Sequence, residues 1–145
     1  MLDIVFISDS VVSDFRKNLI HRICDITQQK FILPKTLEIE FKSLSKNVYA
    51  ETSLDHRFQN RISINDDLDD MEIIKPLIHE LIHLHQKITG KLSIMRDGSF
   101  VWENRTYKIS STMTYQEYKN LPWEADVIQK EKELNSFLYN LSNKD

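Results

Sequence analysis

Residues 75–86 determine how the rest of the chain is interpreted, and they read KPLIHELIHLHQ. His79 and His83 are four residues apart, and Glu80 directly follows the first histidine. On an α-helix, side chains four residues apart lie one above the other on the same face. The apolar residues between them are typical of a buried helix. We predict this helix over about Lys75–Ile88, because a proline suits its first turn and a glycine follows its end.

The H-E-x-x-H spacing indicates a metal site. Two imidazoles on one helix face can bind one ion, and the glutamate can reach a water on that ion without being a ligand. Zn²⁺ is the predicted ion, because imidazole suits it and a catalytic zinc keeps one position open. We therefore predict His79 and His83 as zinc ligands and Glu80 as a general base. The alternative is a core helix with two structural histidines. His85 falls on another part of the helix, and we predict a structural role for it.

Composition excludes several classes of protein. The chain of 145 residues is long enough for one domain with a real core, predicted over 1–145. A net charge of −3 gives no basis for a surface that binds nucleic acid or an anionic membrane. The single cysteine, Cys24, excludes an intrachain disulfide framework, and no apolar run approaches the ~20 residues of a membrane span. We expect a cytoplasmic monomer whose partner is a protein or peptide substrate.

Hydrophobic periodicity places the other elements. We predict a first helix over Val12–Gln29, a hairpin over Lys91–Glu103 with a two-residue Asp-Gly turn, and a last helix from Pro122. Strands are predicted within Leu2–Ile7, Thr36–Phe41, Val48–Thr52 and Phe58–Asn65. The predicted fold class is α+β: a small, mostly antiparallel sheet with a long N-terminal helix, the motif helix and a C-terminal helix. The strand Arg61–Asn65 is either a sheet edge that holds extended substrate or a plain structural strand.

The histidine inventory limits the third ligand. A catalytic zinc usually has three protein ligands, and none of the five histidines follows His85. A carboxylate from a later helix is therefore expected. The last helix offers four such residues: Glu124, Asp126, Glu131 and Glu133.

An H-E-x-x-H helix followed by a carboxylate on a second helix resembles the gluzincins. The Phe100-x-Trp102 hairpin, the turn Leu121–Glu124 and the short chain are similar to small zincin-like metallopeptidases of bacteriophages and bacteria. The resemblance covers about Phe58–Leu138 and implies a zincin-like fold and peptide hydrolysis. A phage-encoded protein would act in the host cytoplasm. The metzincins and SprT-like proteins are excluded as exact matches, because they use a downstream histidine.

Glu124 is the predicted third ligand, since it lies in the first turn of the last helix, on a face with apolar residues. Asp126 is the alternative ligand, and stabilisation of the helix N-terminus is the alternative role for Glu124. The resemblance also implies a tyrosine or histidine that stabilises the oxyanion, for which Tyr118 is the first candidate and Tyr115 the second. Simple packing is the alternative for both tyrosines.

The predicted function is that of a zinc metallopeptidase, a hydrolase that cleaves peptide bonds by a zinc-bound water with Glu80 as general base. A rival from another class is a catalytically inactive zinc-binding domain that recognises a partner protein. A third interpretation is a peptidase kept latent until a partner or processing releases it.

Overall fold

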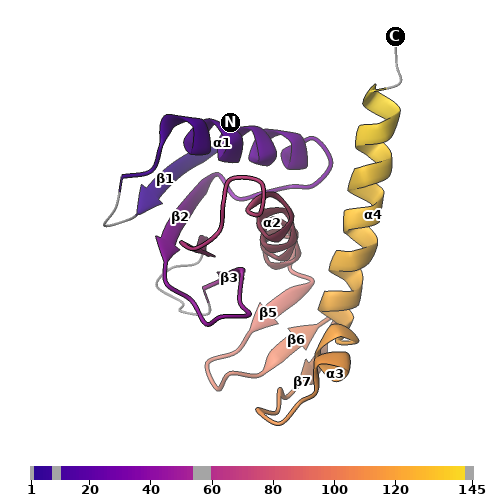
Figure 1. Cartoon of the computed structure of the whole chain (residues 1–145). Coiled ribbons are helices and arrows are strands. Elements are labelled where there is room, and N and C mark those ends of the chain that lie inside the picture. Colours follow the sequence, from indigo (N-terminus) through magenta and orange to yellow (C-terminus); the bar gives the residue numbers. More distant parts are fainter. Residues whose placement is uncertain (1, 8–10, 54–59, 143–145) are drawn as a thin grey trace.

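The computed structural model describes residues 2–7, 11–53 and 60–142 (Figure 1). In this part of the chain it is a mixed α+β structure with two small sheets and four helices. In chain order the elements are β1 (Asp3–Ile7), α1 (Asp14–Gln28), β2 (Thr36–Lys42), β3 (Ala50–Thr52), β4 (Arg61–Asn65), α2 (Ile74–Ile88), β5 (Leu92–Ile94), β6 (Phe100–Trp102), β7 (Arg105–Tyr107), α3 (Tyr115–Lys119) and α4 (Pro122–Ser142).

The larger sheet has the order β1-β2-β4-β3. The pairs β1–β2 and β2–β4 are parallel, and only β3 runs antiparallel to its neighbour β4. The prediction of a mostly antiparallel sheet is therefore wrong here. The physical reason is the crossover through α1, which carries the chain back to the end where β1 began, so that β2 must run parallel to β1.

One face of this sheet is apolar and is covered by α1 and α2. Along β2 the apolar residues Leu37, Ile39 and Phe41 are buried, and they alternate with glutamates that are only partly buried. The buried apolar residues of β2, β4, α1 and α2 belong to one core cluster, which includes Ile20 and Ile23 of α1. The motif helix is thus fixed on the sheet by its own apolar side chains.

The other face of the sheet carries polar side chains. Arg61 donates to Glu38 at 2.9 Å, and Ser63 donates to Glu40 at 3.2 Å, both across the β2–β4 pair. These pairs satisfy polar groups on a face that neither α1 nor α2 covers.

The smaller sheet is antiparallel, with the order β5-β6-β7. The predicted hairpin is confirmed, but its two-residue Asp-Gly turn is wrong: Met95 N donates to Ser99 O at 2.8 Å, so the loop has three residues, Arg96, Asp97 and Gly98. Gly98 adopts a φ of +86° at the end of this loop, a conformation that glycine accepts readily. Leu92 and Trp102 from this sheet pack with Trp123 from the first turn of α4. The hairpin sheet therefore fixes the start of α4.

Helix α4 is the longest element, with 21 residues, whereas α1 has 15. The long helix is thus C-terminal and not N-terminal as predicted, and the short helix α3 precedes it. Helix α4 crosses α2 at a steep angle (Figure 1), and Val127 and Leu134 pack with Ile82 of α2. Among the described residues, no helix is long and apolar enough to cross a membrane.

Candidate metal centre

Helix α2 brings His79, Glu80 and His83 together. Their potential ligand atoms lie within 4.8 Å of one another, close enough to hold a metal ion. Leu77 and Leu81, on the opposite side of the helix, are completely buried in the core. The apolar residues of the motif thus fix the rotation of α2, and this rotation directs the polar residues away from the core.

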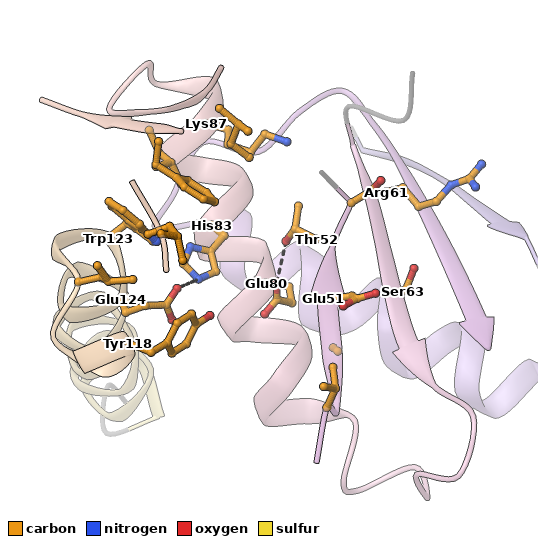
Figure 2. A pocket seen from close by; sticks show the side chains of 18 of the residues that line it. Glu51, Thr52, Arg61, Ser63, Glu80, His83, Lys87, Tyr118, Trp123 and Glu124 are labelled. Carbon is orange, nitrogen blue, oxygen red and sulfur yellow. Dashed lines mark hydrogen bonds and ion pairs between the residues drawn. The ribbon is translucent and has the colours of Figure 1, made fainter. Parts of the chain in front are cut away.

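Glu124 joins the two histidines from α4. Its Oε1 lies 3.1 Å from Nε2 of His79, and its Oε2 lies 2.8 Å from Nε2 of His83. Figure 2 shows the contact between Glu124 and His83. The Nε2 atoms of both rings therefore face one carboxylate, which is only 5% exposed. Two imidazole nitrogens and a carboxylate oxygen are donors that suit zinc.

The Nδ1 atoms of both rings are held by further partners. Nδ1 of His79 lies 2.8 Å from Oε1 of Glu131, on α4. Nδ1 of His83 lies 2.8 Å from Oε1 of Gln86, one turn further along α2. Metal-binding histidines usually use the second ring nitrogen in this way, because the hydrogen bond fixes ring orientation and tautomer. These contacts direct both Nε2 atoms towards the same place.

Charges within the cluster stabilise one another. Burial opposes the charge on His79, but its hydrogen bonds to Glu124 and Glu131 raise its pKa to about 10. The pKa of His83 is also raised, because its bond to Glu124 outweighs burial. Burial would raise the pKa of Glu124, yet the bonds from the two histidines lower it to about 2. Without a metal ion, the three groups therefore form a charged network.

Glu80 has different surroundings from Glu124. Its Oε1 accepts a hydrogen bond of 2.7 Å from Thr52 of β3, which is drawn in Figure 2. Burial raises the pKa of Glu80 against the opposing effects of His83 and Thr52. The carboxylate is thus held on the sheet side of α2, whereas Glu124 approaches the histidines from α4.

A cleft of about 730 Å³ opens beside these residues. Strand β3, Glu80, His83, Tyr118 and Glu124 all contribute to its lining. Figure 2 shows Tyr118 beside Glu124. Burial and the carboxylates of Glu124 and Glu80 raise the pKa of the Tyr118 phenol.

The structure separates the remaining candidates. Asp126 does not approach the histidines directly but accepts from Gln86 at 2.9 Å and pairs with Lys130. His85 bonds through Nδ1 to the carbonyl of Ile32, consistent with the structural role predicted for it. Tyr115 is 73% exposed.

Two predicted features differ from the structure or lie outside it. Strand β4, predicted as a possible substrate-binding edge, lies between β2 and β3, so the edge beside the cleft is β3. The error has a physical cause: β3 is short and shows no clear alternation, so its place in the sheet could not be inferred from periodicity. His56 and the first two residues of the predicted strand Phe58–Asn65 lie outside the described residues.

Three polar contacts of the site were not predicted from the sequence. These are Glu131 with His79, Gln86 with His83, and Thr52 with Glu80. Glu131 follows Glu124 by seven residues, or two helical turns, and Gln86 follows His83 by three, so helical spacing was an available signal for both. Thr52 gave no such signal, because its approach to Glu80 depends on the sheet order.

Comparisons with protein-family models, with curated proteins and with solved structures found no match to this chain.

Proposed function

We propose that this protein is a zinc-dependent peptidase. The observation that carries the proposal is the convergence of His79 Nε2, His83 Nε2 and the Glu124 carboxylate beside a second buried carboxylate, Glu80. A purely structural zinc site has no need of that second acid. The cleft next to it gives a substrate access to the same place.

His79, His83 and Glu124 would hold the metal, which gives three protein ligands and leaves a position open. When bound, zinc supplies a Lewis acid that lowers the pKa of a coordinated water to about 7. The Nδ1 atoms face Glu131 and Gln86, whereas both Nε2 atoms face Glu124, so an ion held by the two rings and this carboxylate would be bound through Nε2. The donor set therefore fits zinc.

Glu80 would act as the general base. It removes a proton from the attacking water and returns it to the leaving amine, so that water is added across the peptide bond. Thr52 holds one carboxylate oxygen of Glu80 and thereby limits its rotation. Tyr118 would donate a hydrogen bond to the oxyanion that forms at the scissile carbonyl.

Strand β3 would bind the substrate backbone. The backbone bonds Ser53 N to Arg61 O and Asn65 N to Tyr49 O mark the positions that pair with β4. Because such positions alternate along an antiparallel ladder, Ala50 and Thr52 direct their N–H and C=O groups to the open edge. An extended peptide can add to such an edge by main-chain hydrogen bonds. This favours a peptide as the substrate class.

The test is zinc content and peptide hydrolysis by the purified protein, with Glu80→Gln as the matched variant. We expect one zinc per chain in both proteins. We also expect cleavage of a mixed peptide library by the wild type and a loss of about 10²–10⁴ in rate for Glu80→Gln, the usual contribution of a general base. His79→Ala, His83→Ala and Glu124→Ala should each lose zinc.

Three outcomes would count against the proposal. Full activity of Glu80→Gln would exclude Glu80 as the general base. Zinc binding without turnover of any peptide would favour the inactive zinc-binding domain. A folded wild-type protein that binds no zinc would exclude the metal site itself.

A further inference from the structure

We propose that Gln86 is a positioning residue that fixes two of the metal ligands, His83 and Glu124, relative to each other. This inference rests on the proposed zinc site and adds a residue to it. Gln86 is completely buried, although it is polar and carries no charge. A buried carboxamide is costly unless its donors and acceptor are satisfied, and here its partners His83, Trp123 and Asp126 belong to the site or adjoin it.

The carboxamide of Gln86 bridges α2 and α4. Its Oε1 lies 2.8 Å from Nδ1 of His83. Its Nε2 donates to the carbonyl of Trp123 at 2.8 Å and to Oδ2 of Asp126 at 2.9 Å. Trp123 directly precedes Glu124 in the first turn of α4. One side chain thus holds the ring of a ligand on α2 and the backbone next to a ligand on α4.

The partners of Gln86 leave only one orientation of its amide. If the amide were reversed, its oxygen would face the Trp123 carbonyl and the Asp126 carboxylate, both of which are acceptors. Its NH₂ group must therefore point to α4 and its oxygen to His83. Nδ1 of His83 must then carry a proton, and the lone pair available to a metal is on Nε2, the atom that faces Glu124. The bridge determines the tautomer as well as the position.

Asp126 is held in turn by Lys130, whose Nζ lies 2.8 Å from Oδ1. This pair is one turn apart on α4 and keeps the carboxylate in the place where it accepts from Gln86. Asp126, the alternative zinc ligand from the sequence, therefore supports the site indirectly, through its hydrogen bond with Gln86.

The two histidines have chemically different supports. His79 is held by a carboxylate, that of Glu131, and His83 by a neutral amide. Only the amide can accept from a histidine and donate to a backbone carbonyl at the same time. We therefore expect substitution of Gln86 to affect the geometry of the whole site, and not only the ring of His83.

The experiment measures zinc affinity by competition with a chromophoric chelator, and the ligand field by the visible spectrum of the Co²⁺-loaded protein. The variant Gln86→Met keeps the side-chain length but removes every hydrogen bond. We expect a 10- to 100-fold loss of zinc affinity, the usual effect of removing a partner of a ligand, and a changed Co²⁺ spectrum. The control is Leu134→Ala, which disturbs the same α2–α4 contact through a residue that is 1% exposed and outside this network. It should destabilise the fold but keep the zinc affinity and the Co²⁺ spectrum.

A second measurement needs no variant and remains decisive if Gln86→Met does not fold. Long-range ¹H–¹⁵N NMR of the zinc-loaded wild type should show that Nδ1 of His83 is protonated and Nε2 is not. A deprotonated Nδ1 would overturn the inference, as would Gln86→Met with unchanged affinity and an unchanged spectrum. In those cases zinc binding by the wild type would leave the proposed function intact. Failure of the folded wild type to bind zinc would overturn both.

Discussion

Tyr118 can be altered without disturbing the core, because its side chain lies on the short helix α3 and is 47% exposed. We expect Tyr118→Phe to lower kcat on the order of 10²-fold, since it removes one hydrogen-bond donor to the developing oxyanion. KM should stay unchanged and zinc should still bind at one per chain, because the phenol hydrogen-bonds to Glu124 but is not itself a proposed ligand. Steady-state kinetics with zinc analysis checks this. An unchanged kcat would exclude the assigned role, and Tyr115→Phe, at an exposed position, is the matched control.

Cys24 gives a residue-scale prediction that is independent of the metal. It is completely buried, and burial, with a smaller effect of Asp25, raises its pKa to about 12. The thiolate is the reactive form, so at pH 8 the folded protein should not react with a thiol reagent on the minutes scale. After denaturation one thiol per chain should react. Rapid labelling of the native protein would contradict the burial of this side chain.

At the scale of the element, β3 can be tested by proline substitution. The N–H of Ala50 points to the open edge, so Ala50→Pro should leave the β3–β4 pairing intact and remove one hydrogen-bond donor to the substrate. We expect a raised KM for peptides with little change in the free energy of unfolding. Kinetics and chemical denaturation measure the two quantities.

The control for that substitution is the neighbouring residue. The N–H of Glu51 points towards β4, because Glu51 lies two residues from both Tyr49 and Ser53, which form backbone hydrogen bonds with β4. Glu51→Pro should therefore destabilise the fold. If the two proline variants behaved alike, β3 would not present a free edge in the way we infer.

Local patterns predicted most elements but not how the strands pair. The periodicity of residues 12–29, the alternation of residues 36–41 and the Asp97-Gly98 turn are each contained in a few neighbouring residues. The parallel pairing of β1 with β2 depends instead on a crossover over the sheet. The position of β3 at the edge depends on which strand lies beside β4. Neither is encoded in a short window of sequence.

In the candidate site, too, contacts within one helix could be predicted from the sequence, whereas contacts between helices could be predicted only in part. The spacing of His79 and His83 predicted their common helix face, with Glu80 one position round, because a single helix determines both. The contact with Glu124 was predicted as one of two options, since the rotation of α4 was unknown. Helical spacing hinted at Gln86 and Glu131, but the contacts of Gln86 with α4 and of Glu131 with His79 depend on how α4 packs on α2.

For the whole molecule, zinc should act as a stabilising ligand. A ligand at 100 times its Kd stabilises the native state by about 2.7 kcal/mol, which for a chain of this size raises Tm by roughly 5–10 °C. We expect this rise in thermal denaturation with zinc, and its reversal with a chelator. The double variant His79→Ala/His83→Ala should show no such response. Equal Tm values of the wild type with and without zinc would argue against the site.

The position of α2 has a consequence for how long the site persists. This helix lies between the core on one side and α4 on the other, and seven of its fifteen residues are buried. Local opening of a protein starts where few apolar contacts must be broken, and backbone amides in the best-packed helices exchange with solvent only on global unfolding. The amide protons of α2 should therefore be among the slowest to exchange with deuterium. The side chains of His79, Glu80 and His83 would then keep their spacing for as long as the native state itself lasts, whereas the amides of α3, which has no buried residues, should exchange sooner.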